Sequence, residues 1–368
     1  MRVQLVDPPA YSPPYDYSLA GALARAGAEV ELLTSRHPYG PPPPPDGFRV
    51  REDFYRRATA RERSATARRA LRVAEHLPDM LRQRRTDADV VHYQWLTLEA
   101  IDAFLMAGGV PRVFTSHNVL RRGSGRLRER AARLVSARAD AIVAHTDAGA
   151  RALVGRFGAD PQRVHMIPHG AFDYLARQEQ EAPLPADLAE VEGPVVLCFG
   201  IVRPYKGVDV LVEAFREIEG AELWVVGRPW MSLEPLVRAA GRSKSRVRFV
   251  ERFVSEPEIP AFFRRADLVV LPYRRIDQSG VLYTALAFGK AMVLSDVGGF
   301  SEIGRVHGAA RLVPPEDPAA LRETLAELLA DPAARAALEE RAAGAAAGPF
   351  SWDHIGRRTL ALYEELRR

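Results

Sequence analysis

A chain of 368 residues is long for a single hydrophobic core, so two domains are expected. Its hydrophobic content of 47% and charged content of 27% are ordinary for a soluble globular protein. Only three of the 51 Lys and Arg residues are lysine. The basic pI of about 9.3 therefore reflects an arginine-rich composition as much as an anionic partner, and no nucleic-acid partner is expected. Cys198 stands alone, which excludes a disulfide or a cysteine metal cluster.

The amino-terminal residues predict a strand, a loop, a helix and a second strand. The expected elements are a buried strand at 2–6, a loop at 10–16 (AYSPPYD), a helix from about Tyr17 to Ala26, and a strand at 28–34. The opening lacks the Gly-x-Gly-x-x-Gly fingerprint of dinucleotide sites, and it is a strand rather than a signal peptide. Because no apolar run is long enough to span a bilayer, we expect a cytoplasmic protein.

The segment from Arg51 to Arg85 is dense in arginine and is expected to be mostly helical. A basic helix suits an anionic lipid surface, which predicts weak peripheral contact with the inner face of a membrane. Acidic residues such as Glu52, Asp53, Glu62 and Glu75 interrupt the charge, so a solvated helix face is the alternative interpretation.

Further strands of the first half end in polar residues. The expected strands are 89–93, 111–116 and 140–145, and His117 comes directly after the second of them. A histidine just past the carboxyl end of a parallel strand is well placed to contact a ligand, so His117 is a candidate site residue. A histidine with only a structural role is the alternative. Residues 178–192 are acidic and contain prolines, which predicts a linker between two domains.

Residues 194–207 predict a phosphate-binding loop. A buried strand at 194–199 precedes the glycine-bounded basic loop 200–207 (GIVRPYKG), and a helix is expected from Val208 to about Ile218. The guanidinium of Arg203 can fork across phosphate oxygens, and Lys206 supplies a compact positive charge. Both are candidates for binding a diphosphate, with an ordinary basic surface loop as the alternative.

The stretch 267–302 predicts a second anion-binding turn. Its expected elements are a strand at 268–271, a loop that ends at Ser279-Gly280, a helix at 281–288 closed by Gly289, and a strand at 291–294. This order is the repeating unit of a doubly wound α/β domain. Backbone N–H groups and the helix dipole gather an anion at such a turn, whereas a crossover that binds nothing is the alternative.

These motifs resemble those of glycosyltransferase family 4, whose members are retaining transferases with the GT-B fold. When the chain is aligned on Gly280, the family's Glu-x7-Glu motif finds Asp277 at its first acidic position and Ala285 at its second. In the family, the second Glu usually holds the nucleotide ribose, which Ala285 cannot do. Residues 289–293 (GKAMV) and 298–302 (GGFSE) match the strand entry and the Gly-Gly-x-x-Glu segment of the family.

The resemblance implies an α/β protein of the GT-B fold. Two Rossmann-like domains would face each other across a cleft, and a C-terminal helix would cross back to the first domain. Residues 1–180, together with that helix at about 352–368, would bind the acceptor, and residues 181–351 would bind the nucleotide-sugar donor. The segments 164–170 (VHMIPHG) and 201–207 are also similar to family motifs, the latter with its arginine moved to position 203.

The implied reaction is a retaining transfer of a sugar from a UDP- or GDP-sugar to a glycan, a lipid-linked acceptor or a small molecule. The donor is a co-substrate, so no cofactor is expected, and no Asp-x-Asp pair stands at a strand end to suggest a metal. Ala285 leaves two alternatives open: a non-catalytic nucleotide-binding or scaffold subunit, and a sugar-nucleotide epimerase or hydrolase of the same fold.

The resemblance implies four groups of site residues. Catalysis would involve His117, Asp277, Arg203 and Lys206. The donor phosphates would be bound by Arg203, Lys206, Ser279, Gly280, Val281 and Leu282. The donor sugar and base would be contacted by Asp277, Gln278, Glu302, Arg252, Phe253 and Val254. Tyr15 and Asp16 would stand on an N-terminal loop that faces the cleft, with a rigid proline turn as the alternative.

Overall fold

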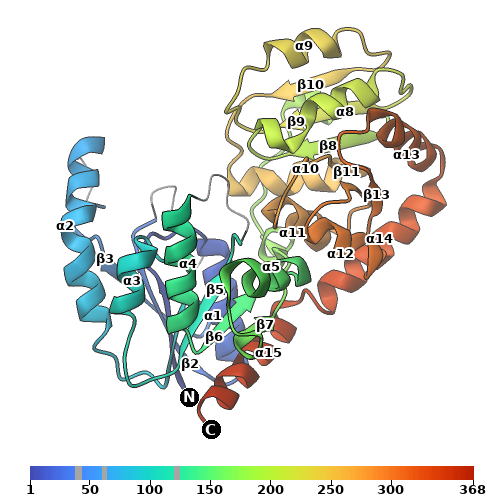
Figure 1. The fold of residues 1–368 in the computed structure, drawn as a ribbon. Coiled ribbons are helices and arrows are strands. Elements are labelled where there is room, and N and C mark those ends of the chain that lie inside the picture. The colour runs from blue at the N-terminus through green and yellow to red at the C-terminus, as the bar shows by residue number, and fades with distance from the viewer. Residues whose placement is uncertain (38–43, 60–63, 120–124) are drawn as a thin grey trace. The chain divides into compact units, whose positions relative to one another are not determined.

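The computed structural model describes residues 1–37, 44–59, 64–119 and 125–368. Of the arginine-dense segment, residues 60–63 lie outside this description. The chain divides into two compact units, one formed by residues 1–170 with 351–368 and the other by residues 171–350 (Figure 1). The first unit ends before residue 180, where the linker was expected to divide the chain.

The first unit is built on a seven-stranded sheet of parallel strand pairs in the order β3-β2-β1-β4-β5-β6-β7. Its strands are β1 (Arg2–Asp7), β2 (Glu29–Ser35), β3 (Arg49–Phe54), β4 (Val90–Tyr93), β5 (Arg112–Ser116), β6 (Ala141–Ala144) and β7 (Val164–Met166). The order of the strands reverses between β1 and β4. Ligands of doubly wound sheets bind at the carboxyl ends of the strands beside such a reversal.

Helices cover both faces of this sheet. They are α1 (Pro13–Arg25), α2 (Ala65–Gln83), α3 (Glu99–Leu105), α4 (Arg126–Arg138), α5 (Asp147–Phe157) and α15 (Trp352–Leu366), with a 3-10 turn η1 (Pro161–Arg163) before β7. Consecutive strand residues point to opposite faces, so Val91 joins the apolar cluster under α2 to α5, whereas Val90 joins the cluster under α1 and α15. The candidate residues of the first unit lie between these two layers.

The last helix, α15, packs along α1 although the two are far apart in the sequence. At their crossing, a Cβ atom on Gly356 would lie 2.7 Å from the carbonyl oxygen of Ala22, so glycine is needed for this close approach. Arg25 of α1 adds an ion pair of 2.8 Å to Asp353 of α15. Residues 351–368 therefore belong to the first unit.

The second unit is built on a six-stranded parallel sheet in the order β10-β9-β8-β11-β12-β13. Its strands are β8 (Val195–Phe199), β9 (Glu222–Val226), β10 (Val247–Val250), β11 (Leu268–Leu271), β12 (Met292–Ser295) and β13 (Arg311–Val313). Here the order reverses between β8 and β11. The two motif loops that the sequence singled out therefore follow neighbouring strands at the reversal.

Two apolar clusters also flank the second sheet. Its helices are α6 (Asp173–Arg177), α7 (Ala186–Ala189), α8 (Val208–Phe215), α9 (Glu234–Ala240), α10 (Ile259–Arg265), α11 (Gly280–Ala287), α12 (Gly299–Arg305), α13 (Pro318–Ala330) and α14 (Pro332–Ala347), with 3-10 turns η2 (Pro204–Lys206) and η3 (Glu256–Glu258). The segment predicted as a linker, 178–192, is part of this unit. It contains α7, and its Glu181 pairs with Arg264 at 2.7 Å.

Three predicted elements differ from the structure. Helix α1 begins at Pro13 rather than at Tyr17, because prolines fit the first turn, where no backbone N–H is needed. The arginine-dense segment begins as strand β3 and becomes helical only at Ala65. The run 321–347, whose Ala, Leu and Glu content predicts one helix, is two helices, because Pro332 starts a new one with Asp331 as its N-cap.

Candidate active site

Lys206 is buried at the carboxyl edge of the second sheet. Its Nζ lies 5.1 Å from the centre of the Tyr273 ring, and a Cβ on Gly200 (φ +100°) would lie 2.8 Å from that Nζ. Glycine at 200 therefore provides both the left-handed turn and the space for the ammonium group. Burial lowers the pKa of Lys206. Within the described ranges, this Nζ forms no hydrogen bond or ion pair, so the site lacks a counter-ion.

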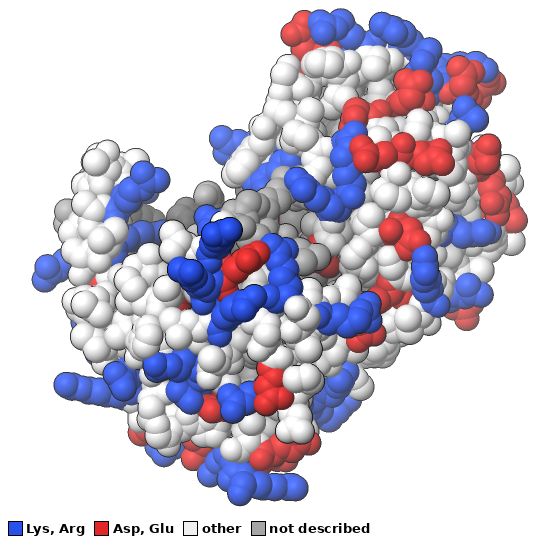
Figure 2. Space-filling model, viewed as in Figure 1, with Lys and Arg blue, Asp and Glu red and all other residues white. Residues whose placement is uncertain are grey.

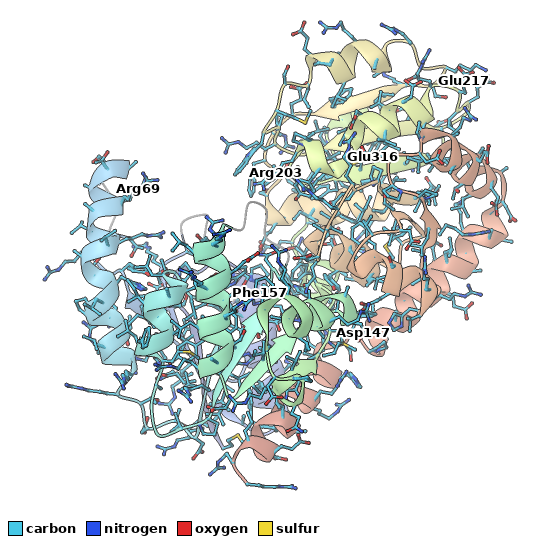
Figure 3. All side chains as sticks on the ribbon, in the orientation of Figure 1. Arg69, Asp147, Phe157, Arg203, Glu217 and Glu316 are labelled. Atoms are coloured by element: carbon cyan, nitrogen blue, oxygen red, sulfur yellow. The ribbon has the colours of Figure 1, made fainter. Side chains whose placement is uncertain are left out.

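Arg203 lies on the same loop, three residues before Lys206 (Figure 3). Its guanidinium carbon is 4.0 Å from the centre of the exposed Trp230 ring. Its Nε is buried and has no hydrogen-bond partner among the residues that the structure describes. Two cations of one loop thus stand without a carboxylate. Trp230, which follows β9, was not among the predicted residues.

Helix α11 begins at Gly280 without a side-chain cap. The N–H groups of Ser279, Gly280 and Val281 donate to no atom of the described chain, as expected for the first turn of an uncapped helix. Leu282 instead donates its N–H to the carbonyl oxygen of Ser279 at 3.0 Å, and its side chain lies in the core. The N–H of Leu282 is therefore already hydrogen-bonded, and three N–H groups without such a bond remain at this helix end.

Arg274 ties the two motif loops together. Its guanidinium forms ion pairs with Asp209 at 2.7 Å and with Glu316 at 2.8 Å, and it donates to the carbonyl oxygen of Pro204 at 2.6 Å. The bond to Arg274 holds the pKa of Asp209 below its usual value. This arginine therefore fixes the loop after β8 against the loop after β11. Arg274 was not predicted as a site residue. The one sequence signal for it was its position shortly after strand β11.

The residues predicted for the donor sugar lie on adjacent loops of the second unit. Asp277 and Gln278 are half-buried before α11, and the carbonyl oxygen of Asp277 accepts the N–H of Gly299 at 3.3 Å. Gly299 starts α12, which carries Glu302 in its first turn. Ala285 is fully buried in the apolar core of the unit, so its side chain offers nothing to a ribose.

The turn predicted to receive the base, 252–254, is largely occupied by internal contacts. Arg252 forms an ion pair of 2.5 Å with Glu258 and also donates to the carbonyl oxygen of Phe253 at 3.1 Å. Val254 is part of the core. The side chains of Phe253 and Arg252 are 62% and 45% exposed, whereas that of Val254 is buried. The contact of this turn with a base stays a prediction.

In the first unit, His117 lies in a cluster of aromatic rings. Trp95 stacks on it with centroids 4.7 Å apart and ring planes at 10°, and Tyr15 meets it edge-on at 4.8 Å. Its Nε2 lies 3.2 Å from Oε1 of Gln94, and its Nδ1 lies 3.3 Å from Nε2 of His145. These groups follow β4, β5 and β6, so neighbouring strands deliver them to one edge of the sheet.

The bonds of His145 determine which nitrogen of His117 carries a proton. Burial lowers the pKa of His145 to about 4, so the ring is neutral near pH 7. Its Nδ1 donates to the carbonyl oxygen of Ile167 at 2.9 Å, which leaves Nε2 as an acceptor for Nδ1–H of His117. A neutral His117 then carries its lone pair on Nε2. Rotation of the Gln94 side-chain amide by 180° exchanges its oxygen and nitrogen. The buried Nε2 of Gln94, which otherwise has no hydrogen-bond partner in the described chain, then donates to the lone pair on His117.

Two buried carboxyl groups hold the first loop of this unit. Asp7 ends β1 and accepts the N–H of Tyr11 at 2.9 Å, and Asp16 of α1 is close enough for the two carboxyl groups to interact. Burial raises the pKa of Asp7 to about 6, and burial together with the charge of Asp7 raises that of Asp16. Ser12, on the same loop, accepts Nε1–H of Trp95 at 2.8 Å. The loop thus positions the indole that stacks on His117.

These positions correct the prediction for Tyr15 and Asp16. Tyr15 and Asp16 lie in the first turn of helix α1 and are buried, so they are not on an exposed loop. The strand end at His92-Tyr93 is also interior. His92 bonds to the hydroxyls of Tyr363 and Thr115 at 2.6 Å each, and Tyr93 donates to Gln83 at 3.0 Å, so both residues serve the packing of the unit.

Both halves of the chain match families of known proteins. Residues 15–171 match the family described as Glycosyltransferase Family 4, and residues 193–331 match the one described as Glycosyl transferases group 1. The D-inositol 3-phosphate glycosyltransferase of Xylanimonas cellulosilytica is 31% identical over 394 residues, which cover 95% of this chain and 90% of the relative. The chain belongs to glycosyltransferase family 4. The relative of the same description in Jonesia denitrificans is 29% identical, with 96% of this chain and 90% of the relative covered.

Solved structures show the fold of this glycosyltransferase. Sucrose-phosphate synthase from Thermosynechococcus elongatus gives a TM-score of 0.73 at 20% identity, with 100% of this chain and 99% of that chain covered. Anabaena HepE in complex with UDP gives 0.71 at 18% identity, with 99% and 100% covered. The two parallel-sheet α/β units are those of the GT-B fold, so the predicted fold class and family are confirmed.

The predicted activity of the family 4 enzyme is also confirmed at the level of its class. Its relatives are described as glycosyltransferases, which does not favour the scaffold or epimerase alternatives. The residues that the sequence did not single out are Asp7, Gln94, Trp95, His145 and Trp230. Each follows or ends a strand at the carboxyl edge of its sheet, and that position was the one signal that could have indicated them.

Proposed function

We propose that this glycosyltransferase moves a sugar, with retention of anomeric configuration, from a UDP- or GDP-sugar to an acceptor hydroxyl. The observation that carries the proposal is the buried Lys206, which has no anionic partner in the described chain and shares the sheet edge with Arg203 and three open N–H groups. Departure of a nucleoside diphosphate places negative charge on phosphate oxygens. Each such preorganised donor typically contributes about 3–4 kcal/mol to stabilising that charge.

The remaining roles follow from the chemistry of each group. Asp277, Gln278 and Glu302 would bind hydroxyls of the donor sugar, and the exposed rings of Phe253 and Trp230 would contact the base. On Nε2, His117 would accept a hydrogen bond from a hydroxyl at the reacting face in place of the bond to the Gln94 amide. In this proposal the first unit binds the acceptor and the second binds the donor. HepE has been solved with UDP and with UDP-glucose, which supports a donor of this class.

Thermal unfolding with UDP, GDP, ADP and their common sugars tests the donor site. A ligand at a hundred times its Kd should stabilise the protein by about 2.7 kcal/mol. We expect UDP or GDP to protect the wild type and Lys244→Ala, whose lysine is exposed, but not Lys206→Ala. Protection by no nucleotide, or equal protection of Lys206→Ala, would overturn the proposal. Turnover with the protecting donor, and NMR of the product anomer, then test transfer and retention.

We also propose a weak peripheral contact of α2 with anionic lipid at the inner membrane face. Val73, Leu77 and Leu81 recur every fourth residue on α2 and are 70%, 48% and 45% exposed. Arginines such as Arg69 project from the same helix, and Figure 2 shows basic side chains beside uncharged surface there (Figures 2 and 3). Within the described ranges, no helix has the length and hydropathy needed to cross a bilayer.

Flotation with phosphatidylglycerol and phosphatidylcholine vesicles tests this contact. We expect binding to the anionic vesicles only, with a loss on Leu77→Asp and no change on Val237→Asp, which alters an exposed apolar residue of α9. If neither kind of vesicle carries the protein in flotation, the proposal is wrong, and the basic face of α2 is simply exposed to solvent.

A further inference from the structure

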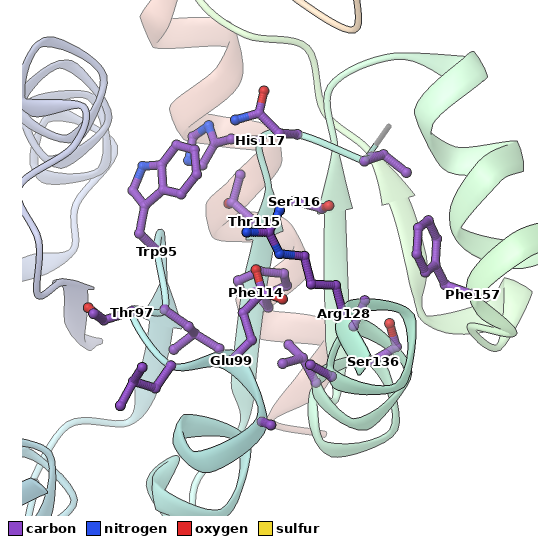
Figure 4. Close-up of a pocket in the computed structure, with 18 of the residues that line it drawn as sticks. Trp95, Thr97, Glu99, Phe114, Thr115, Ser116, His117, Arg128, Ser136 and Phe157 are labelled. Carbon is purple, nitrogen blue, oxygen red and sulfur yellow. The ribbon is translucent and has the colours of Figure 1, made fainter. Parts of the chain in front are cut away.

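The first unit contains a pocket of about 410 Å³ that none of the predicted roles uses. It lies between α3, α4 and the end of β5, and His117 and Trp95 form part of its lining (Figure 4). Its volume falls in the range of about 300–1,000 Å³ that is typical of small-molecule sites. Because His117 lies in its lining, the pocket is adjacent to the group proposed to contact the reacting hydroxyl.

The lining of the pocket is mainly apolar. The apolar side chains that the structure places around it include Phe114, Val119, Ala132, Val135, Leu153 and Phe157. Small-molecule sites are typically lined by hydrophobic and aromatic side chains together with a few polar groups, and this lining has that character. The pocket also reaches the surface beside large apolar side chains, since Ile101 and Leu127 line it and are 50% and 80% exposed. Exposed apolar surface around a cavity is typical of a ligand site.

Among the described residues that line the pocket, Arg128 is the one cation. Arg128 of α4 lines the pocket near Thr115 and Ser116, and it forms no ion pair in the described part of the chain (Figure 4). The acidic residue next to it, Glu129, is paired with Arg156 at 2.7 Å. Glu99 also lines the pocket, but no ion pair joins it to Arg128. Helix α4 carries five arginines, so its field favours an anion over the pocket.

We propose that this pocket binds the apolar part of the acceptor, and that the acceptor is an anionic amphiphile. Its alkyl or aryl body would fill the space between α3 and α4, its acidic group would bind Arg128, and its hydroxyl would lie at the His117 end. This inference rests on the proposed transfer reaction. It selects one class among the glycan, lipid-linked and small-molecule acceptors that the sequence left open.

Calorimetric titration of the full chain with simple alkyl ligands below their micelle concentrations tests the pocket without a donor. The probes are hexyl phosphate, octyl phosphate, octyl glucoside and inorganic phosphate. Each buried methylene is worth about fourfold in affinity, so octyl phosphate, which has two more methylenes, should bind about fifteenfold more tightly than hexyl phosphate. Octyl glucoside should bind more weakly than octyl phosphate. Inorganic phosphate has no alkyl chain, so it should show no detectable binding at Arg128; any weak binding should be the same in Arg128→Gln.

Matched variants on α4 locate the binding. Ala132→Phe fills the pocket and should abolish the dependence on chain length, with an intermediate effect for Ala132→Leu, whereas Ala137→Phe lies on the exposed side of the same helix and should change nothing. Arg128→Gln should reduce octyl phosphate to the affinity of octyl glucoside, while Arg130→Gln should not. Circular dichroism establishes that each variant is folded.

Three results would overturn the proposal. Equal affinities for hexyl and octyl phosphate, or no binding of either, would show that the pocket takes no alkyl group. Wild-type binding by a folded Ala132→Phe would place the ligand elsewhere. Equal binding of octyl glucoside and octyl phosphate would remove the anionic group from the proposal. The thermal response to UDP and GDP in the same preparations tests the donor site separately, so failure of one proposal is distinguishable from failure of the other.

Discussion

At the carboxyl edge of the second sheet, Lys206, Arg203 and the first N–H groups of α11 are donors for which the described chain supplies no acceptors. At the same edge of the first sheet, several polar side chains bond to one another: His117 to His145, and Trp95 to Ser12. A set of donors without acceptors is built for an anion that comes from outside. A set of internally bonded groups instead fixes the position of one member, here His117.

The two groups of residues should therefore respond differently to mutation. Removing an unpartnered donor should weaken ligand binding and turnover and leave stability nearly unchanged. Removing a member of the bonded network should change stability, pH dependence or the position of another group. The predictions below test this contrast.

The largest effect is expected for Lys206→Ala. Loss of one preorganised charge at the leaving diphosphate should lower kcat/KM about 10³-fold, because a single such donor contributes about 3–4 kcal/mol. Unfolding by urea should show no loss of stability, since a buried ammonium without a partner is removed. Lys244→Ala, which only breaks exposed ion pairs to Glu217 and Glu219, is the matched control. A stable variant with wild-type turnover would refute the role of Lys206.

In the first unit, His117→Ala should lower kcat about 10²-fold, the lower end of the effect of a group acting on a reacting hydroxyl. His145→Ala should cost only about tenfold, because it acts through a single hydrogen bond to His117. His145→Gln can still accept that bond and should recover part of the loss, which a purely structural role would not predict. His165→Ala, on β7, is the control. Equal losses for the His117 and His145 variants would mean that His117 has no separate role.

The strands and motif loops of the second unit could be predicted from the sequence, because glycines mark the turns: Gly200 follows β8, and Gly280 follows β11 at the start of α11. Packing of the segment 178–192 into the unit, and the contacts of Arg274 and Trp230, were not predicted. The N–H of Leu282 and the side chains of Val254 and Arg252 also have internal contacts that the sequence did not indicate. Such internal bonds depend on packing that local sequence does not specify.

The site of the first unit could be predicted only in part, because it is assembled from the ends of several strands. His117 was predicted from its place after β5, whereas Trp95 and His145 become neighbours only through the parallel pairing of β4, β5 and β6. The burial of Tyr15 and Asp16 depended on α1 starting at Pro13, which the predicted loop did not include. No sequence pattern indicated the pocket between α3 and α4, since its volume results from tertiary packing.

A smaller effect is expected for Asp16→Asn, measured as stability against pH. The folded pKa of Asp7 is raised to about 6 and that of Asp16 is also raised, so the folded state holds protons that the unfolded state has released. Stability should therefore fall as pH rises from about 4 through these folded values. Asp16→Asn removes one of these groups and can still donate to Asp7, so we expect a gain of roughly 1–3 kcal/mol at pH 8 and a flatter profile.

Urea unfolding between pH 4 and 8 measures this profile. Asp353→Asn is the control, because it removes an exposed carboxylate that pairs with Arg25 on the same unit and should leave the profile unchanged. If Asp16→Asn has the same dependence of stability on pH as the wild type, the raised pKa of Asp16 does not contribute to that dependence, and the prediction is wrong.

The smallest expected effect is the uptake of protons by Lys206 when a diphosphate binds beside it. Burial lowers the pKa of Lys206, and a bound diphosphate beside Nζ should raise it again, so binding of UDP or GDP should take up a fraction of a proton. Calorimetry at pH 9 in two buffers of different ionisation enthalpy measures this uptake, since the phosphates are fully ionised there. Lys206→Arg keeps the charge but remains protonated at this pH, so it should bind without uptake. The same uptake in Lys206→Arg would assign the proton to another group and remove the evidence that Lys206 meets the diphosphate.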